Sequence, residues 1–280
     1  MLGDAGSIKN HLLQELDADR LVLPTLPEVA LKAREAANDP DTDIPTLQEM
    51  VGSDAALSTR VVKVANSPLV RGVSRIDDLP TALSRLGVTY SCNLVIGLAM
   101  EQMFQATNAA IDQMLREVWS RSAEVAAIAN VLARHYSDLE PDKATLAGLT
   151  HLIGVLPILS YAEENVDNLS EEEIANLESV IQEISPGIGK HILEHWEFPQ
   201  AIAAIPEAHL DFMRQSEHLD LTDIVIAARI QSYGYPGLSA DQGQASEIPA
   251  MSKLGLSTDG ESLELSELSE EISDAVEVLH

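Results

Sequence analysis

The longest apolar stretch of the chain, ATLAGLTHLIGVLPILSYA at residues 144–162, limits what this sequence can fold into. The stretch approaches the length of a membrane span, but it contains His151, two glycines and Pro157, and the segment after it is acidic. We therefore predict a helix that is buried on all sides. A chain of 280 residues is long enough to build the core that such a helix requires, in one large domain or two small packed ones.

Other segments of the chain also favour helices over strands. Aromatic residues make up only 4% of the sequence, and no Asn-Gly or Asp-Gly turn separates two apolar segments. Apolar residues instead recur at spacings of three and four, as in Leu57, Val61 and Val64. Helix stops are visible at Asn38-Asp39-Pro40 and at Glu140-Pro141. The sequence therefore predicts an all-α fold.

The organisation of the chain changes near residues 105–112, where short helices with tight turns give way to longer Ala/Leu-rich helices. No Gly/Ser-rich linker divides the two blocks, so we expect packed lobes within one unit, residues 1–280. We predict an N-terminal helical lobe at 1–107, a helical core at 108–235, and an acidic C-terminal loop and helix at 236–280. The apolar stripe of this last segment predicts a docked helix rather than a free tail, and its members are Leu263, Leu265, Leu268, Ile272, Val276 and Leu279.

The charge of the chain argues against two classes of partner. Lys and Arg total 17 and Asp and Glu total 45, which gives a formal net charge of −28. Such a field repels phosphate backbones and anionic lipids, so we expect neither nucleic acid nor a membrane surface as a partner. The single cysteine, Cys92, cannot form an internal disulfide, and no secretory leader is evident at the start. We therefore expect a cytoplasmic protein.

A resemblance to a known family rests on four short motifs. They are Leu23-Pro24-Thr25-Leu26-Pro27, Asp54-x-x-Leu57, Ala65-Asn66-Ser67 and Ala82-x-x-x-Leu86-Gly87. With the later segments VWSRSAEVAAIANVLA, AGLTHLIGVLPIL and HWEFPQAIAAIPEAH, the sequence from about Leu21 to Tyr233 resembles the HDOD family, the HD-related output domains of bacterial signalling proteins. The resemblance implies an HD-like multi-helix bundle with the N-terminal lobe packed on it. No receiver, cyclase or kinase segment is expected, so the output would pass through a separate partner.

The same resemblance locates the positions of a former metal site. Working HD hydrolases gather a His, an adjacent His-Asp pair and a later Asp around divalent metal ions. In this sequence the first His falls near Arg121, the pair falls on His151 and Leu152, and the closing Asp falls near Ala228. Only His151 could ligate a metal. We therefore expect vestigial positions, with no metal, no cofactor and no catalytic residue.

Two of these vestigial residues have alternative interpretations. His151 is either a core histidine bonded to a carbonyl or a neighbouring side chain, or a residue with a remaining function. Arg121 is either a charge satisfied by a carboxylate such as Glu124, or a fixed positive charge at the vacated metal position.

A second motif, His191-Ile192-Leu193-Glu194-His195, matches the His-x-x-Glu-His string of inverted zinc peptidases. It places two imidazoles one turn apart on a helix, but a zinc site needs a third ligand that no other motif names. We favour an amphipathic helix that keeps His191 and His195 on a wet or half-wet face.

A candidate interaction edge follows the helix that ends at Asn66 and Ser67. Asn before Ser-Pro is a natural helix terminator whose side chain satisfies local backbone groups. The alternative is that Asn66 and Ser67, with Arg71 and Arg75, form a recognition edge in which the two arginines receive a carboxylate or phosphate from a partner.

Three functions remain open at this point. The first is a non-catalytic signalling module that binds another signalling protein; homo-oligomer formation is left open. The second is a metal-dependent phosphohydrolase with altered ligands, recruited from His209, His135 or nearby acidic residues. The third is a small-molecule sensor that uses the old active-site cavity. Because metal geometry is demanding, the ligand inventory favours the first.

Overall fold

A computed structural model describes residues 3–67, 70, 74–233, 248–256 and 268–279 of the chain. Every regular element among these residues is a helix, which confirms the predicted all-α fold. The helices of the first half are α1 (Ala5–Asp17), α2 (Glu28–Asn38), α3 (Ile44–Gly52), α4 (Ala55–Ala65), α5 (Leu79–Leu86), α6 (Val88–Met100) and the short 3-10 helix η2 (Glu101–Met103). Those of the second half are α7 (Ala109–Tyr136), α8 (Pro141–Thr150), α9 (Val155–Asn165), α10 (Glu171–His195), α11 (Gln200–Ala203), α12 (Ile205–Ala208), α13 (Leu221–Tyr233), α14 (Pro249–Lys253) and α16 (Ser269–Leu279).

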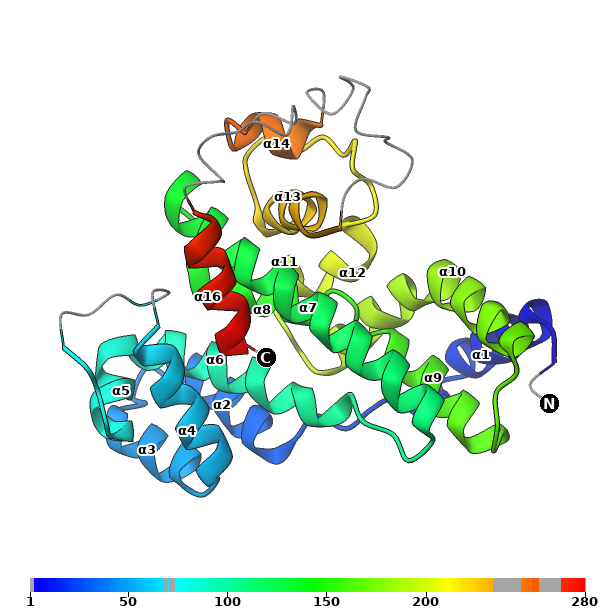
Figure 1. The fold of residues 1–280 in the computed structure, drawn as a ribbon, viewed down its shortest axis with the longest axis horizontal. Coiled ribbons are helices and arrows are strands. Elements are labelled where there is room, and N and C mark those ends of the chain that lie inside the picture. Colours follow the sequence, from blue (N-terminus) through cyan, green and yellow to red (C-terminus); the bar gives the residue numbers. More distant parts are fainter. Residues whose placement is uncertain (1–2, 68–69, 71–73, 234–247, 257–267, 280) are drawn as a thin grey trace.

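Three short helices of the first half, α3, α4 and α5, begin at aspartate caps. The side chains of Asp43, Asp54 and Asp78 accept hydrogen bonds from backbone N–H groups in the first turns of α3, α4 and α5. Each cap satisfies donors that a helix start otherwise leaves without a partner. Three helices can therefore follow one another closely, and α2 to α6 form the lobe at one end of the molecule (Figure 1).

Helix α1 differs from the prediction of one N-terminal lobe over residues 1–107. It lies at the opposite end of the molecule from α3 to α5 and packs on α10 (Figure 1). Ile8 and Leu12 are buried there, and Lys9 forms an ion pair with Glu183 of α10. The non-helical Leu-Pro-x-Leu-Pro segment explains the separation, because each proline holds the residue before it in an extended conformation and so carries the chain across the molecule.

The long helix α7 organises the second half. It crosses the centre of the molecule and packs against α8, α9, α13 and α16 (Figure 1). Its central residues, from Ala123 to Ala133, are almost all fully buried. The helices that surround α7 form a core that includes the C-terminal helix α16, and α6 joins the N-terminal lobe to this core through contacts with α8.

The apolar stretch at residues 144–162 forms two helices instead of the single helix predicted. Helix α8 ends at Thr150, a turn follows, and α9 begins at Val155. The turn ends at Gly154, where an added Cβ would lie 1.9 Å from the Ser185 carbonyl oxygen of α10. By length and hydropathy the segment Pro141–Asn165 could cross a membrane, but 83% of its apolar window is buried inside the protein. It is therefore the central core segment of this fold, buried as predicted.

The C-terminal helix α16 is docked, as its apolar stripe predicts, although Leu263 and Leu265 lie outside the described residues. Its buried Glu271 accepts hydrogen bonds from Arg134 and contacts His135, both on α7. At the other end of the helix, Arg60 of α4 donates to the Leu279 carbonyl. Helix α16 therefore ties the core to the N-terminal lobe.

Helices α7 and α8 approach each other closely at a glycine. A Cβ at Gly148 would lie 2.4 Å from the Ala126 Cα, which is backbone that cannot turn aside. At Gly52, by contrast, the nearest atom to an added Cβ is a Leu79 methyl group at 3.9 Å. Only a residue without a side chain fits at Gly148.

We predict that Gly148→Ala lowers the free energy of unfolding by at least about 2 kcal/mol, because the helices must separate to accept the methyl group. Gly52→Ala is the matched control and should change stability by less than about 1 kcal/mol. Urea unfolding followed by circular dichroism measures both values. Equal stabilities for the two variants would show that the α7–α8 contact is looser than described.

Candidate functional site

His151 lies at the end of α8, at the position of the vestigial His-Asp pair, and is almost completely buried. Its Nδ1 is 2.6 Å from the Gly148 carbonyl oxygen. Because a carbonyl only accepts, Nδ1 carries the proton and Nε2 is left as an acceptor. Burial, with a smaller effect of the Arg229 charge, lowers the pKa of His151 to about 3. This is the bonding predicted for a core histidine.

A second buried histidine, His209, lies against the first. The two rings meet edge to face with their centroids 5.0 Å apart. His209 follows the short helix α12 and is 2% exposed. Burial holds the pKa of His209 well below its usual value, and the nearby His151 and Arg229 act in the same direction. Both rings are therefore neutral at physiological pH.

A cation, Arg229 of α13, lies beside the two histidines and is 7% exposed. Its Nη1 donates to Nδ1 of His209 over 2.7 Å and to the His209 carbonyl over 2.9 Å. Its Nε donates to the Tyr233 hydroxyl over 2.6 Å, and this hydroxyl lies 3.4 Å from Nε2 of His151. The guanidinium also lies over the Phe212 ring, 5.0 Å from its centroid. We call His151, His209, Phe212, Arg229 and Tyr233 the histidine–arginine cluster.

The histidine–arginine cluster does not fit a divalent metal ion. Nδ1 of His151 is protonated, Nδ1 of His209 accepts from Arg229, and a fixed positive charge lies beside both rings. The cluster contains no carboxylate. Across the described part of the chain, no group of three or more His, Cys, Asp or Glu side chains is placed to hold a metal ion.

The other vestigial positions are not equivalent. Ala228 is fully buried beside Arg229, and Leu152 is half-buried next to His151. Arg121 is exposed on α7, so the hypothesis that it supplies a buried charge at the vacated metal position is wrong. No ion pair of Arg121 with Glu124 or another carboxylate is found among the described residues. The buried guanidinium is that of Arg229, whose sequence signal was a lone cation within the apolar run IVIAARI.

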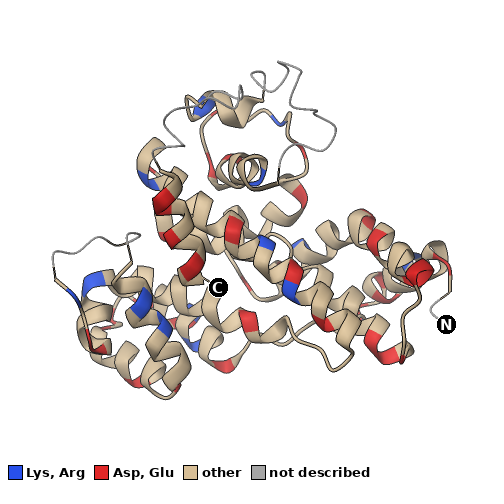
Figure 2. Cartoon of the chain, in the orientation of Figure 1, with Lys and Arg blue, Asp and Glu red and all other residues tan. Residues whose placement is uncertain are grey.

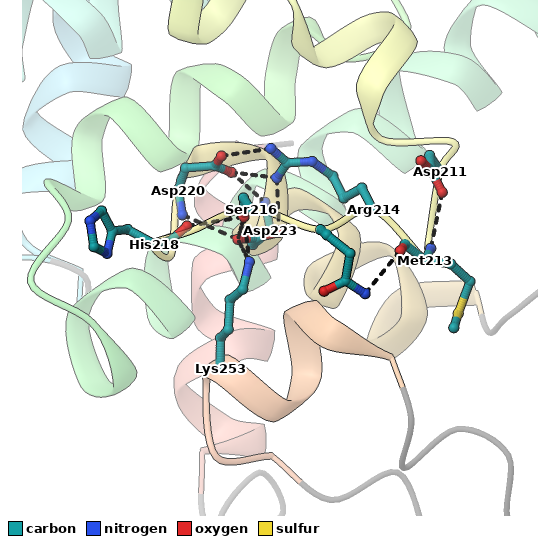
Figure 3. A network of polar contacts seen from close by, with 9 residues as sticks. Asp211, Met213, Arg214, Ser216, His218, Asp220, Asp223 and Lys253 are labelled. Atoms are coloured by element: carbon teal, nitrogen blue, oxygen red, sulfur yellow. Dashed lines mark hydrogen bonds and ion pairs between the residues drawn. The ribbon is translucent and has the colours of Figure 1, made fainter.

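The loop that carries His209 and Phe212 is held by a second polar network (Figure 3). At its centre is Asp223 of α13, which is fully buried and accepts from Arg214, Ser216 and Lys253 over 2.8 to 2.9 Å. Lys253 comes from α14, so one carboxylate joins the loop, α13 and α14. Asp220 and Asp223 also cap each other's backbone N–H groups at the start of α13. The position of the histidine–arginine cluster depends on this network.

The His-x-x-Glu-His string lies on the last turns of α10. His191 is half-buried, whereas Glu194 and His195 are exposed. No third ligand joins these histidines in the described part of the chain. The amphipathic-helix interpretation therefore fits the structure.

Asn66 and Ser67 have the local capping role that their sequence context predicts. Asn66 Nδ2 donates to the carbonyls of Val62 and Ile76, and Asn66 Oδ1 accepts from the Ile76 backbone. The Ser67 hydroxyl donates to the Val64 carbonyl over 2.7 Å. Both side chains thus fix the backbone at the end of α4, and their own polar groups are used in doing so.

A groove of about 750 Å³ nevertheless lies beside these two residues. Asn66, Ser67 and the exposed Arg75 contribute to one wall, and Arg71 lies outside the described residues. The opposite wall is α16, which the linear order of the sequence could not indicate. The remaining charged residues that line the groove are Lys63, Asp77, Arg85, Asp274 and Glu277.

Comparisons with known proteins show the family to which the chain belongs. The sequence matches the HDOD domain family over residues 23–212, and the chain belongs to this family. A structure from Shewanella amazonensis, a "Putative metal-dependent phosphohydrolase", is 31% identical, with 98% of this chain and 97% of that chain covered and a TM-score of 0.83. An "HDOD domain protein with unknown function" from Geobacter sulfurreducens is 22% identical, with coverages of 99% and 98% and a TM-score of 0.69. A "Putative signal transduction protein" from Marinobacter aquaeolei is 20% identical, with coverages of 99% and 67% and a TM-score of 0.59.

A curated relative from Treponema pallidum is 24% identical over 195 residues. The match spans 66% of this chain but only 37% of the length of that relative. This chain therefore covers little more than a third of the length of that relative.

The buried histidines predict acid sensitivity. The pKa of His151 is lowered from about 6.5 to about 3, and the pKa of His209 is lowered too, so between these values the unfolded chain binds protons that the folded chain does not. Stability is therefore lost as the pH falls below about 6.5. Between about pH 7.5 and pH 5.5, the free energy of unfolding should fall by roughly 1 kcal/mol for each histidine.

Urea unfolding at several pH values measures this slope. His151→Gln should remove about half of it, whereas His218→Gln, which changes a side chain that is 87% exposed, should leave it unchanged. A flat stability profile across this range in the unmodified protein would contradict the neutral, buried state of the two rings.

Proposed function

We propose that this protein is a non-catalytic signal-transduction module that acts by binding another signalling protein. The observation that carries the proposal is the buried Arg229 guanidinium at the vestigial site. It donates a hydrogen bond to Nδ1 of His209, so this nitrogen is not available to a metal ion. It also adds a positive charge where a metal enzyme needs anionic ligands. The signalling role follows from membership of the HDOD family and from the name of the Marinobacter protein.

The alternative function is that of a metal-dependent phosphohydrolase. It is supported by the name of the Shewanella protein, with which this chain shares 31% identity. It would require ligands recruited from elsewhere, and His209 and His135 were the candidates. His209 is already bonded to Arg229, and His135 contacts Glu271 at the docking site of α16. In the described part of the chain neither histidine has a neighbouring ligand set, so we favour the non-catalytic function.

The groove beside α16 is the surface that we assign to the partner. Several Lys and Arg residues lie on α4 and α5, whereas Asp and Glu are spread over the whole molecule (Figure 2). Arg75 is 86% exposed and pairs with Asp77, which is 80% exposed, an arrangement that an incoming anion can displace at little cost. A carboxylate or phosphate of the partner protein would bind at this edge. The net charge of −28 argues against nucleic acid or an anionic membrane there.

Metal content separates the two functions. After purification without chelating resin and incubation with manganese, iron or zinc, elemental analysis should find no stoichiometric metal in the protein. No metal should raise the melting temperature either, because only a ligand that binds the folded state does so. One or two tightly held ions that are lost on His151→Ala would overturn the proposal and favour the phosphohydrolase.

Charge reversal tests the partner surface. We expect Arg71→Glu/Arg75→Glu to abolish capture of a cellular partner that the unmodified protein retains, since the double change replaces two positive charges of the predicted edge with negative charges that repel an anion. Arg20→Glu/Lys32→Glu is the matched control, because it makes the same charge change at two exposed positions outside the groove. Affinity purification with mass spectrometry compares the three proteins, and circular dichroism verifies their folding. Retention of the same partner by all three would exclude this edge.

A further inference from the structure

A separate pocket of about 310 Å³ lies where the N-terminal lobe meets the core. Residues of α2 and α6 line one side, and residues of α8 and α11 line the other. Its apolar surface comes from buried side chains, among them Ile96, Leu146, Phe198 and Ile202. None of these residues belongs to the histidine–arginine cluster or to the groove beside α16. The volume is at the lower end of the range for small-molecule sites.

The charged residues that line the described part of this pocket are basic, whereas the chain as a whole is strongly acidic. The described lining includes two cations, Arg34 and Lys143, together with the amides of Asn38 and Asn93, and it includes no Asp or Glu. The whole sequence has 45 acidic and 17 basic residues, so a lining with only basic charges is unexpected. A pocket with apolar walls and cations near its edge suits a ligand that has the same two parts.

Both cations have donors that a ligand could use. Arg34 donates to the Trp196 carbonyl and pairs with Glu197, whose side chain is 80% exposed. Lys143 pairs with Glu140, which is 61% exposed. The Lys143–Glu140 pair is exposed on both sides and contributes little free energy, so an anion in the pocket can replace it. The Arg34 side chain is only 15% exposed, but its acidic partner Glu197 lies in solvent and can move away. Arg34 has five N–H donors, more than these two partners use.

One carboxylate lies close behind the lining. Asp142 is 8% exposed and accepts from Asn93 Nδ2 over 2.7 Å. This bond engages the carboxylate and fixes the Asn93 amide. The head group of a ligand is therefore expected on the side of Arg34 and Lys143.

We propose that this pocket binds a small amphipathic anion. A carboxylate, sulfonate or phosphate head group would bind Arg34 and Lys143, and a compact apolar body would pack against Ile96, Leu146 and Ile202. Because the walls come from both halves of the molecule, the bound ligand would hold the N-terminal lobe on the core. This adds a small-molecule site to the partner-binding function and is independent of the groove.

The test uses the fluorescent probe 1-anilinonaphthalene-8-sulfonate, which has an anionic head and a compact aromatic body. The unmodified protein should bind it saturably at one site. Lys143→Glu, which reverses the charge, and Ala201→Trp, which fills the pocket from an exposed position of α11, should each raise the Kd by about tenfold or more. The matched controls Lys32→Glu and Ala56→Trp, at exposed positions outside the pocket, should change it by less than about twofold.

A second probe, N-phenyl-1-naphthylamine, has the same aromatic body without the sulfonate. We expect it to bind more weakly than the sulfonate and to be insensitive to Lys143→Glu. Equal affinity for the two probes, with no effect of Lys143→Glu on either, would overturn the role of the anion. Unsaturable binding, or equal Kd values for all variants, would overturn the site itself. Circular dichroism of each variant excludes unfolding as the cause of a weakened Kd.

Discussion

The buried guanidinium of Arg229 is the constraint on which the centre of this structure depends. Burying a cation costs free energy unless hydrogen bonds and dipoles replace its water. Every contact described for Arg229 is with a neutral group: the His209 ring and carbonyl, the Tyr233 hydroxyl, and the Phe212 and Tyr233 rings. Both histidines must consequently stay neutral, and the loop with His209 must be held firmly. The Asp223 network supplies that rigidity.

How much the sequence could predict depended on whether each feature was local. The helical periodicity and the capping role of Asn66 are set by neighbouring residues, and both were predictable. The break between α8 and α9 depends on close contact between Gly154 and α10, and the position of α1 depends on a partner far along the chain. Periodicity contains no information on such contacts.

Arg121 and Arg229 illustrate the same limit at the candidate site. Family spacing predicted the vestigial positions, and two of the residues at these positions, His151 and Ala228, are buried. It could not say which arginine is buried, because that depends on which face of α7 is covered by α8, α13 and α16. Arg121 lies on an exposed face of α7, whereas the residues of α13 from Leu221 to Arg229 are buried. The position of Arg229 within an apolar run was one indication that this arginine is buried, because a charge in such a run must find a partner.

The arrangement of α16 and the lobe gives a physical basis for regulation. Helix α16 is one wall of the groove, and its bonds to α4 and α7 hold the lobe and the core together at that edge. The amphipathic-anion pocket lies at another junction of the same two bodies. A ligand that holds the junction closed would favour one position of the lobe, and therefore one shape of the groove. Such coupling is reciprocal, so a partner bound in the groove would change the affinity of the pocket for its ligand by the same factor.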